Sequence, residues 1–202
     1  MSGDHYFTAE PASAAERRPL SVELAGRRLS LQTAGGIFSP DRVDAGTGVL
    51  LRTVPPPPAE GNLLDLGCGW GAVALGLGLR SPAAHVYAVD VNERALALTR
   101  ANAATAGIDR LTASRPQDVP AEVRFAAIWS NPPIRVGKDA LHEMLSTWLP
   151  RLDAGGTAYL VVQKNLGADS LQRWVNESLT GLTCERFAND RGFRVLAVRW
   201  DD

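Results

Sequence analysis

The chain has 202 residues, of which 45% are hydrophobic and 21% are charged, and its formal net charge is −1. This composition is typical of one folded domain with a single hydrophobic core, and the near-neutral charge argues against a protein that coats nucleic acid through a broad basic face. The sequence lacks a long apolar run and a basic-then-apolar leader, so we expect a cytoplasmic chain without a membrane span or a secretory signal.

Cysteine and histidine are too sparse to indicate a metal site or a disulfide framework. Cys68 and Cys184 are the only cysteines, and His5, His85 and His142 are isolated from one another. A structural zinc site needs clustered ligands, and a catalytic site of the H-E-x-x-H type needs paired histidines. We therefore expect reduced cysteines and no bound metal.

The first elements form an N-terminal extension over residues 1–58. Apolar positions on both sides of Ala25-Gly26 predict a β-hairpin over residues 21–33. Helical spacing predicts a helix over residues 41–54, which the prolines at 55–58 end and continue as a stiff linker. The second unit is predicted to cover residues 59–202.

From residue 62 onward, short apolar runs alternate with amphipathic stretches, as in a parallel sheet with crossover helices. The predicted strands are 62–66, 85–89, 111–114, 125–130 and 157–163, and the predicted helices are 70–80, 93–106, 138–152 and 170–179. Residues 153–156 form a connection, and a turn at 188–192 joins two antiparallel runs, 182–187 and 193–200. The predicted fold is α/β: a doubly wound, seven-stranded, mostly parallel Rossmann-like sheet with a C-terminal antiparallel strand pair and a small N-terminal hairpin and helix.

The turn after the first strand of this sheet is rich in glycine. Ligands of open α/β sheets bind outside the carboxyl ends of the strands, and residues 65–71 read D-L-G-C-G-W-G at such an end. Glycine there allows the backbone to approach a ligand closely. The spacing differs from the dinucleotide fingerprint G-x-G-x-x-G, and the carboxylate of Asp65 suits a cationic ligand better than a pyrophosphate. A tight turn without a ligand is the alternative.

Asp90 directly follows the second strand of the sheet. A carboxylate at this position can accept hydrogen bonds from both hydroxyls of a ribose. Together with the glycine-rich turn and Asp65, it predicts a ligand that combines a nucleoside, a positive centre and an amino-acid tail. S-adenosylmethionine is such a molecule.

The fourth strand ends in the tetrapeptide N-P-P-I at residues 131–134. Proline fixes φ and removes backbone donors, so the Asn131 side chain and nearby carbonyls can be held rigidly toward one point. Acceptors that converge on a planar exocyclic amine would draw its lone pair toward an electrophilic methyl group, mainly by orientation and without a general base. Asn131, Pro132 and Pro133 are therefore the predicted catalytic residues. A plain strand-ending turn is the alternative.

In this order, residues 65–71, 89–92 and 130–134 resemble the motifs of class I S-adenosylmethionine-dependent methyltransferases that modify exocyclic amino nitrogens. The resemblance is closer still to the small methyltransferase domain of the bacterial ribosomal RNA guanine-N2 methyltransferases, which include the ribosomal RNA small-subunit methyltransferase C enzymes. It extends over residues 5–7, 36–39, 44–47, 137–138, 161–164 and 192–196.

This resemblance implies S-adenosylmethionine as the cofactor and assigns roles to individual residues. The implied cofactor-binding residues are Asp65, Gly67, Gly69, Gly71, Asp90, Asn92, Asp118 and Asn131. Asp65 would organise the amino-acid end of the cofactor, and Asp118 would approach the adenine amino group. The implied substrate-binding residues are Phe38, Ile134, Arg135, Lys138, Gln163 and Lys164, for the last four of which a solvated surface group is the alternative.

Four positions qualify this picture. Phe38 and Thr47 correspond to a segment that packs over the cofactor, with a core aromatic and a helix-capping threonine as the alternatives. Ala126 stands where the family usually has an acidic residue. Ile134 stands where many amino methyltransferases have Tyr or Phe, so stacking on a flipped base is weaker or comes from elsewhere. Phe38 and Trp129 are the candidates, with a core position as the alternative for Trp129.

The reaction implied by the resemblance is methylation of an exocyclic amine, with guanine N2 of ribosomal RNA as the first choice. Ribosomal RNA or a ribosomal subunit is then the expected partner, and no oligomeric state is predicted. The alternatives are the amide of a protein glutamine, a small-molecule amine, and a degenerate domain that binds cofactor or RNA without turnover. The intact residues 131–133 argue against the last of these.

Overall fold

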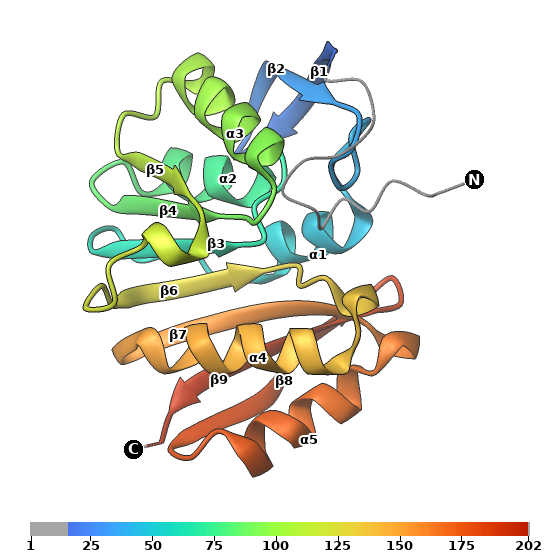
Figure 1. Cartoon of the computed structure of the whole chain (residues 1–202), viewed down its shortest axis with the longest axis vertical. Coiled ribbons are helices and arrows are strands. Elements are labelled where there is room, and N and C mark those ends of the chain that lie inside the picture. Colours follow the sequence, from blue (N-terminus) through green and yellow to red (C-terminus); the bar gives the residue numbers. More distant parts are fainter. Residues whose placement is uncertain (1–15, 202) are drawn as a thin grey trace.

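The computed structural model describes residues 16–201, so the motif expected at residues 5–7 lies outside the described residues (Figure 1). One seven-stranded sheet has the order β5-β4-β3-β6-β7-β9-β8. Its strands are β3 (Asn62–Leu66), β4 (His85–Val89), β5 (Leu111–Ser114), β6 (Phe125–Ser130), β7 (Leu152–Gln163), β8 (Leu182–Asp190) and β9 (Phe193–Trp200). The pairs from β5 to β7 are parallel, and β9 is antiparallel to both β7 and β8. The predicted fold class is confirmed.

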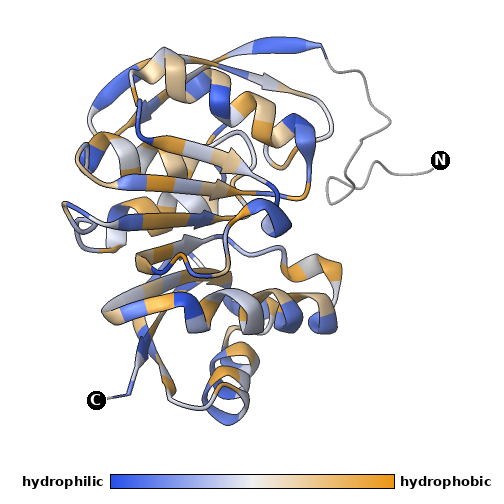
Figure 2. Ribbon diagram, turned by 60° about the vertical axis from the view of Figure 1, so that its left-hand side comes forward, coloured by the Kyte–Doolittle hydropathy of each residue, from blue (hydrophilic) through white to orange (hydrophobic). Residues whose placement is uncertain are grey.

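Helices cover both faces of the sheet. α1 (Ala45–Thr53), α2 (Ala72–Arg80) and α3 (Glu93–Ala106) pack on one face, and α4 (Lys138–Trp148) and α5 (Ala168–Ser178) pack on the other. Neighbouring strand residues point to opposite faces, so Leu63 joins the first core and Leu64 the second. α4 and α5 contain both hydrophobic and hydrophilic residues (Figure 2), whereas α2 has no charged residue before Arg80.

The N-terminal hairpin docks on α2 and α3 through one buried face. Its strands are β1 (Arg17–Leu24) and β2 (Arg27–Ala34), which confirms the predicted hairpin and lengthens it. Ala25 and Gly26 both have positive φ, as a two-residue turn requires. The Asn102 carboxamide of α3 pairs with the Gln32 backbone, accepting from N at 2.8 Å and donating to O at 2.9 Å. The boundary at residue 58 stays a prediction.

Two predicted connections differ in the structure: residues 153–156 belong to a strand, and the turn predicted at 188–192 is only two residues long. β7 begins at Leu152, so residues 153–156 belong to the strand, and α4 ends at Trp148 before a 3-10 turn, Leu149–Arg151. A Cβ on Gly156 would lie 3.0 Å from the Phe125 carbonyl oxygen, and the β6–β7 register shifts at this point, as in a bulge. β8 likewise runs to Asp190, because Arg191 and Gly192 make a two-residue turn with positive φ.

The other predicted elements occur in the structure with small shifts at their ends. No helix within residues 16–201 has the length and the apolar character needed to cross a membrane.

Candidate active site

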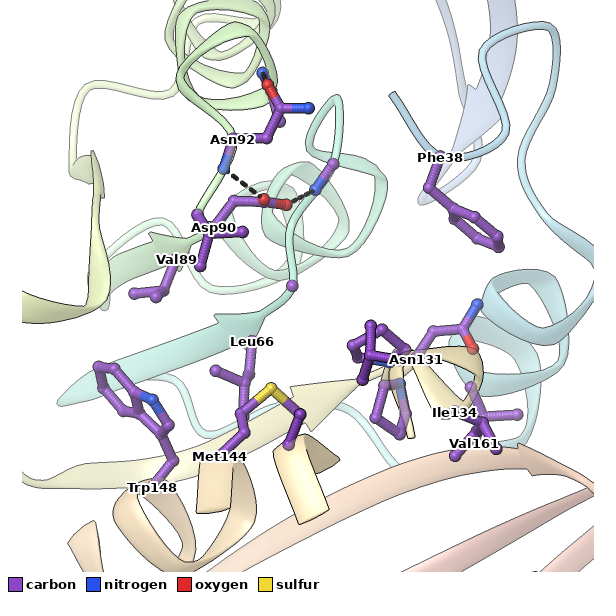
Figure 3. A pocket seen from close by; sticks show the side chains of 18 of the residues that line it. Phe38, Leu66, Val89, Asp90, Asn92, Asn131, Ile134, Met144, Trp148 and Val161 are labelled. Carbon is purple, nitrogen blue, oxygen red and sulfur yellow. Dashed lines mark hydrogen bonds between the residues drawn. The ribbon is translucent and has the colours of Figure 1, made fainter. Parts of the chain in front are cut away.

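A pocket of about 750 Å³ opens where β3, β4 and β6 end (Figure 3). Its floor and walls are largely apolar, with Leu66, Val89, Met144, Trp148 and Val161 among them. The polar side chains of Asp90 and Asn131 reach it from the ends of β4 and β6, the two strands that flank β3. An apolar pocket with a few convergent polar groups is the usual form of a small-molecule site.

Asp90 is held in place by two backbone N–H groups. Its Oδ2 accepts from Gly69 N at 2.9 Å and its Oδ1 from Asn92 N at 2.9 Å (Figure 3). Burial raises the pKa of Asp90, and these N–H groups act against the rise. The carboxylate still has lone-pair capacity for a ligand.

Asn92, predicted as a neighbour of the cofactor, uses its side chain within the protein. Its Oδ1 accepts from Arg94 N and Ala95 N and so caps α3. Its Nδ2 donates to the Gly36 carbonyl at 2.9 Å, which ties the segment after β2 to the rim of the pocket.

The glycine-rich turn divides into two parts with different roles. Gly67 and Gly69 line the pocket with positive φ, and a Cβ at either position would have no neighbour within 4 Å. Their backbone is therefore open to a ligand. Gly71 does not line the pocket; a Cβ there would lie 3.0 Å from Thr99 Oγ1, so Gly71 serves the packing of α2 on α3.

Asp65 is buried beneath this turn and lines a small adjoining cavity of about 30 Å³. Its Oδ2 accepts from Ala74 N at 2.8 Å. Burial, together with the nearby charge of Asp90, raises the pKa of Asp65 from 3.8 to about 8, although the Ala74 hydrogen bond acts in the opposite direction. A cationic ligand would favour the ionised carboxylate, so its affinity should rise as the pH rises toward 8.

We expect Asp65→Asn to stabilise the ligand-free protein at alkaline pH. The folded pKa is raised, so the contribution of Asp65 to stability is fully present below its ordinary pKa of 3.8 and is lost as the pH rises through about 8. Asparagine can still accept from Ala74 N and carries no charge. Urea unfolding of both proteins at pH 5 and pH 8.5 should show the variant gaining on the wild type at pH 8.5, by on the order of a few kcal/mol. A difference that does not change with pH would contradict this assignment.

Asn131 is anchored by a segment that the sequence did not connect to it. Its Nδ2 donates to Asp44 Oδ2 at 2.8 Å and to Thr47 Oγ1 at 3.1 Å. Pro132 O accepts from Ile134 N at 2.9 Å across Pro133, so the chain turns sharply after β6. In the sequence, an aspartate at position 44 indicates at most the N-cap of a helix. It does not indicate a contact with Asn131, which is 87 residues away.

The structure excludes the alternative roles considered for Phe38 and Thr47. Phe38 is 42% exposed and lines the pocket, so it is not a core aromatic. Thr47 is buried, and the residue that caps α1 is Asp44. Trp129 is 1% exposed and packs against Tyr159, so it is not available to stack on a base.

The remaining predicted residues fall into two groups. Pro132, Pro133, Ile134 and Gln163 line the pocket. Asp118, Lys138 and Lys164 are exposed and do not line it, so their roles stay predictions, as does that of Arg135, whose side chain lies outside the described part of the structure. Within residues 16–201 no group of His, Cys, Asp or Glu side chains could hold a metal ion.

Comparison with known proteins identifies the family of this chain. The family model of the methyltransferase small domain matches residues 28–197. The chain is 32% identical over 170 residues to the YbxB protein of Bacillus subtilis, covering 83% of this chain and 85% of that protein. It is 32% identical over 196 residues to ribosomal RNA small subunit methyltransferase C of Pseudomonas paraeruginosa, covering 95% of this chain and 57% of that protein.

A solved structure shares the fold. The Thermus thermophilus 16S rRNA N2 G1207 methyltransferase, solved with AdoMet and guanosine, superposes with a TM-score of 0.76 at 22% identity and covers 92% of this chain and 51% of that chain. The chain thus spans about half the length of the curated methyltransferase C relatives and of this solved protein.

Proposed function

Because this chain belongs to the methyltransferase small domain family, we propose that it uses S-adenosylmethionine to methylate an exocyclic amine, and that the amine is guanine N2 of ribosomal RNA. The observation that carries the proposal is the pairing, in one apolar pocket, of the fixed Asp90 carboxylate with the anchored Asn131 carboxamide. The Asp90 carboxylate can accept hydrogen bonds from ribose hydroxyls, and the Asn131 carboxamide oxygen can accept a hydrogen bond from an amine.

The residues of the pocket fit the cofactor. Asp90 would accept hydrogen bonds from the ribose hydroxyls, and the open backbone of Gly67 and Gly69 leaves space for the methionine part. Asp65, beneath this backbone, would favour the cationic end of the ligand. When bound, S-adenosylmethionine supplies an electrophilic methyl group on a positively charged sulfur. The contact of Asp118 with adenine remains a prediction from the resemblance.

The protein contributes mainly orientation to the reaction. Asn131 Oδ1 would accept an N–H of the acceptor amine and turn the nitrogen lone pair toward the methyl carbon. The amine nitrogen would form the new bond to the methyl carbon as the bond from that carbon to the cofactor sulfur breaks. S-adenosylhomocysteine would be the leaving group, and the proton that the amine sheds would pass to water. Leu66 and Val161 give the pocket apolar walls near these groups.

Two observations support RNA as the source of the amine. The methyltransferase C relative and the solved structure are named as ribosomal RNA methyltransferases, and the solved one is in complex with AdoMet and guanosine. The pocket also has an exposed aromatic side chain, Phe38, at its rim, which suits stacking on an extruded base.

The decisive experiment is transfer of labelled methyl from S-adenosylmethionine into ribosomes and ribosomal RNA from a strain that lacks this gene. We expect label in N2-methylguanosine, transfer that falls as salt rises, and loss of signal with ribonuclease. Label that resists ribonuclease and appears in protein glutamine would overturn the RNA assignment in favour of a protein amide. Label in neither macromolecule, with cofactor binding intact, would favour a small amine.

Phe38→Ala should raise the KM for the RNA substrate by roughly 10- to 100-fold, since a stacked base contributes about 1–3 kcal/mol. The Kd for S-adenosylmethionine, measured by calorimetry, should stay within a few fold. Phe187→Ala is the matched control, because Phe187 is 40% exposed and does not line the pocket. An equal rise in KM for both variants would remove Phe38 from the substrate site.

A further inference from the structure

Three polar side chains meet where β6 ends and the turn at residues 131–134 begins. Asn131, at the end of β6, donates from Nδ2 to Asp44 Oδ2 at 2.8 Å and to Thr47 Oγ1 at 3.1 Å. Asp44 and Thr47 lie at the start of α1, within the predicted N-terminal extension. Asn131 and Asp44 line both the main pocket and the small adjoining cavity, and Thr47 lines the cavity.

This arrangement fixes which way the carboxamide of Asn131 faces. Only its NH₂ group can donate, and its two partners here are a carboxylate and a hydroxyl oxygen. A reversed carboxamide would place Oδ1 against the negatively charged Asp44 oxygen and lose both hydrogen bonds. Oδ1 must therefore point away from Asp44, and among the described residues none donates to it.

Asp44 is itself held by the backbone that it caps. The same Oδ2 accepts from Gly46 N at 2.8 Å and from Thr47 N at 3.2 Å. A Cβ on Gly46 would lie 3.0 Å from Asp44 Oδ2 and 3.0 Å from the ring of Phe193, so position 46 has no room for a side chain. α1 packs in turn on β7 and β9. The carboxylate is thus fixed relative to the sheet on which Asn131 stands.

We propose that Asp44 and Thr47 are positioning residues for methyl transfer, which hold Asn131 Nδ2 so that Oδ1 faces the acceptor amine. This inference rests on the proposed function. It makes the N-terminal extension a part of the catalytic apparatus rather than a cover for the sheet. Without the anchor, the carboxamide rotates about its side-chain torsions, and a large share of its orientations offers the amine an N–H group instead of an oxygen.

Three variants separate positioning from folding. Asp44→Ser keeps a good N-cap residue but has a side chain too short for the contact with Asn131. Thr47→Val removes only the hydroxyl and leaves the cap intact. Asp44→Asn keeps an oxygen, which the N–H groups of Gly46 and Thr47 orient, and so should restore the anchor.

We expect Asp44→Ser to lower kcat on ribosomal RNA by roughly 10- to 100-fold and Thr47→Val to lower it by about 3- to 10-fold. KM for RNA and Kd for S-adenosylmethionine should stay within a few fold, and Asp44→Asn should recover most of the lost kcat. An unchanged kcat in Asp44→Ser, a parallel loss of cofactor affinity, or no recovery in Asp44→Asn would each overturn the inference.

A second measurement needs neither cofactor nor activity. In the ligand-free protein the Asn131 NH₂ protons should exchange slowly with solvent, and the Asp44→Ser exchange should be several-fold faster in NMR spectra. Equal exchange in the two proteins would count against the anchor. If the wild type transfers no methyl group to any amine, the proposed function fails, whereas an active wild type with fully active variants refutes only the roles of Asp44 and Thr47.

Discussion

Asn131→Ala is expected to lower kcat for methyl transfer by roughly 10²- to 10³-fold, the loss that follows removal of one preorganised polar group at a reacting centre. In the proposed mechanism Asn131 Oδ1 accepts an N–H of the acceptor amine, and alanine leaves no acceptor in its place. The Kd for S-adenosylmethionine should change by no more than a few fold, because Asp90, Gly67 and Gly69 remain in position. Single-turnover transfer and calorimetry on the same preparations give the two numbers.

The control for Asn131→Ala is the same change at Asn165, an exposed asparagine in the turn after β7 that does not line the pocket. It should leave both kcat and Kd unchanged. Loss of the Asp44 partner also predicts a small loss of stability in Asn131→Ala, about 1 kcal/mol for one hydrogen bond. If cofactor affinity falls as far as kcat does, Asn131 belongs to the cofactor site and the acceptor role is wrong.

The sheet could be predicted from the sequence because its signals are local. Residues 62–66 and 85–89 are short apolar runs bounded by polar turn residues, and both strands occur with those bounds. The hairpin was predictable for the same reason, from Ala25-Gly26 between alternating apolar positions. The strand ends at Gly67, Asp90 and Asn131 follow from the sheet, since parallel strands bring their carboxyl ends to one edge.

The errors in the predicted elements and site arose at glycines, because a glycine can mark a turn, a bulge or a close packing contact. Gly155 and Gly156 suggested a connection, but in the structure they allow β7 to bulge while it stays paired with β6. Gly71 has the same appearance in sequence as Gly67 and Gly69, and only the proximity of Thr99 shows that it serves packing. The local sequence does not show which atoms of the folded chain would contact a side chain at a glycine position.

The hydrogen bonds that anchor Asn131 could not be predicted from the sequence for a different reason. Asp44 and Asn131 are 87 residues apart, and each has a sufficient local explanation, one as a helix cap and the other as the start of a proline turn. Their contact depends on how α1 packs against β7 and β9, which is a tertiary fact. The resemblance placed Thr47 in a segment that packs over the cofactor and gave no role to Asp44. The hydrogen bonds to Asn131 supply a reason for both residues.

Asp90→Ala is expected to weaken S-adenosylmethionine binding by roughly 10²- to 10³-fold, since hydrogen bonds to a charged group contribute about 1.5–3 kcal/mol each. The loss has two sources: the ribose hydroxyls lose their acceptor, and the N–H groups of Gly69 and Asn92 lose the carboxylate that holds the turn in shape. At saturating cofactor, kcat should recover to within about tenfold of the wild type, because Asn131 is anchored from α1 and not through Asp90.

Two further variants complete this test: Asp90→Asn examines whether a carboxylate is required, and Asp109→Asn is the control. Both Asp90 oxygens accept from backbone N–H groups, so an asparagine there must set its NH₂ against one of these donors, and it should bind cofactor almost as weakly as alanine does. Asp109 is exposed in the turn before β5 and does not line the pocket, so its variant should bind normally. A Kd for Asp90→Ala equal to that of the wild type would remove Asp90 from the ribose site, and the acceptor geometry at Asn131 would then need a cofactor bound elsewhere in the pocket.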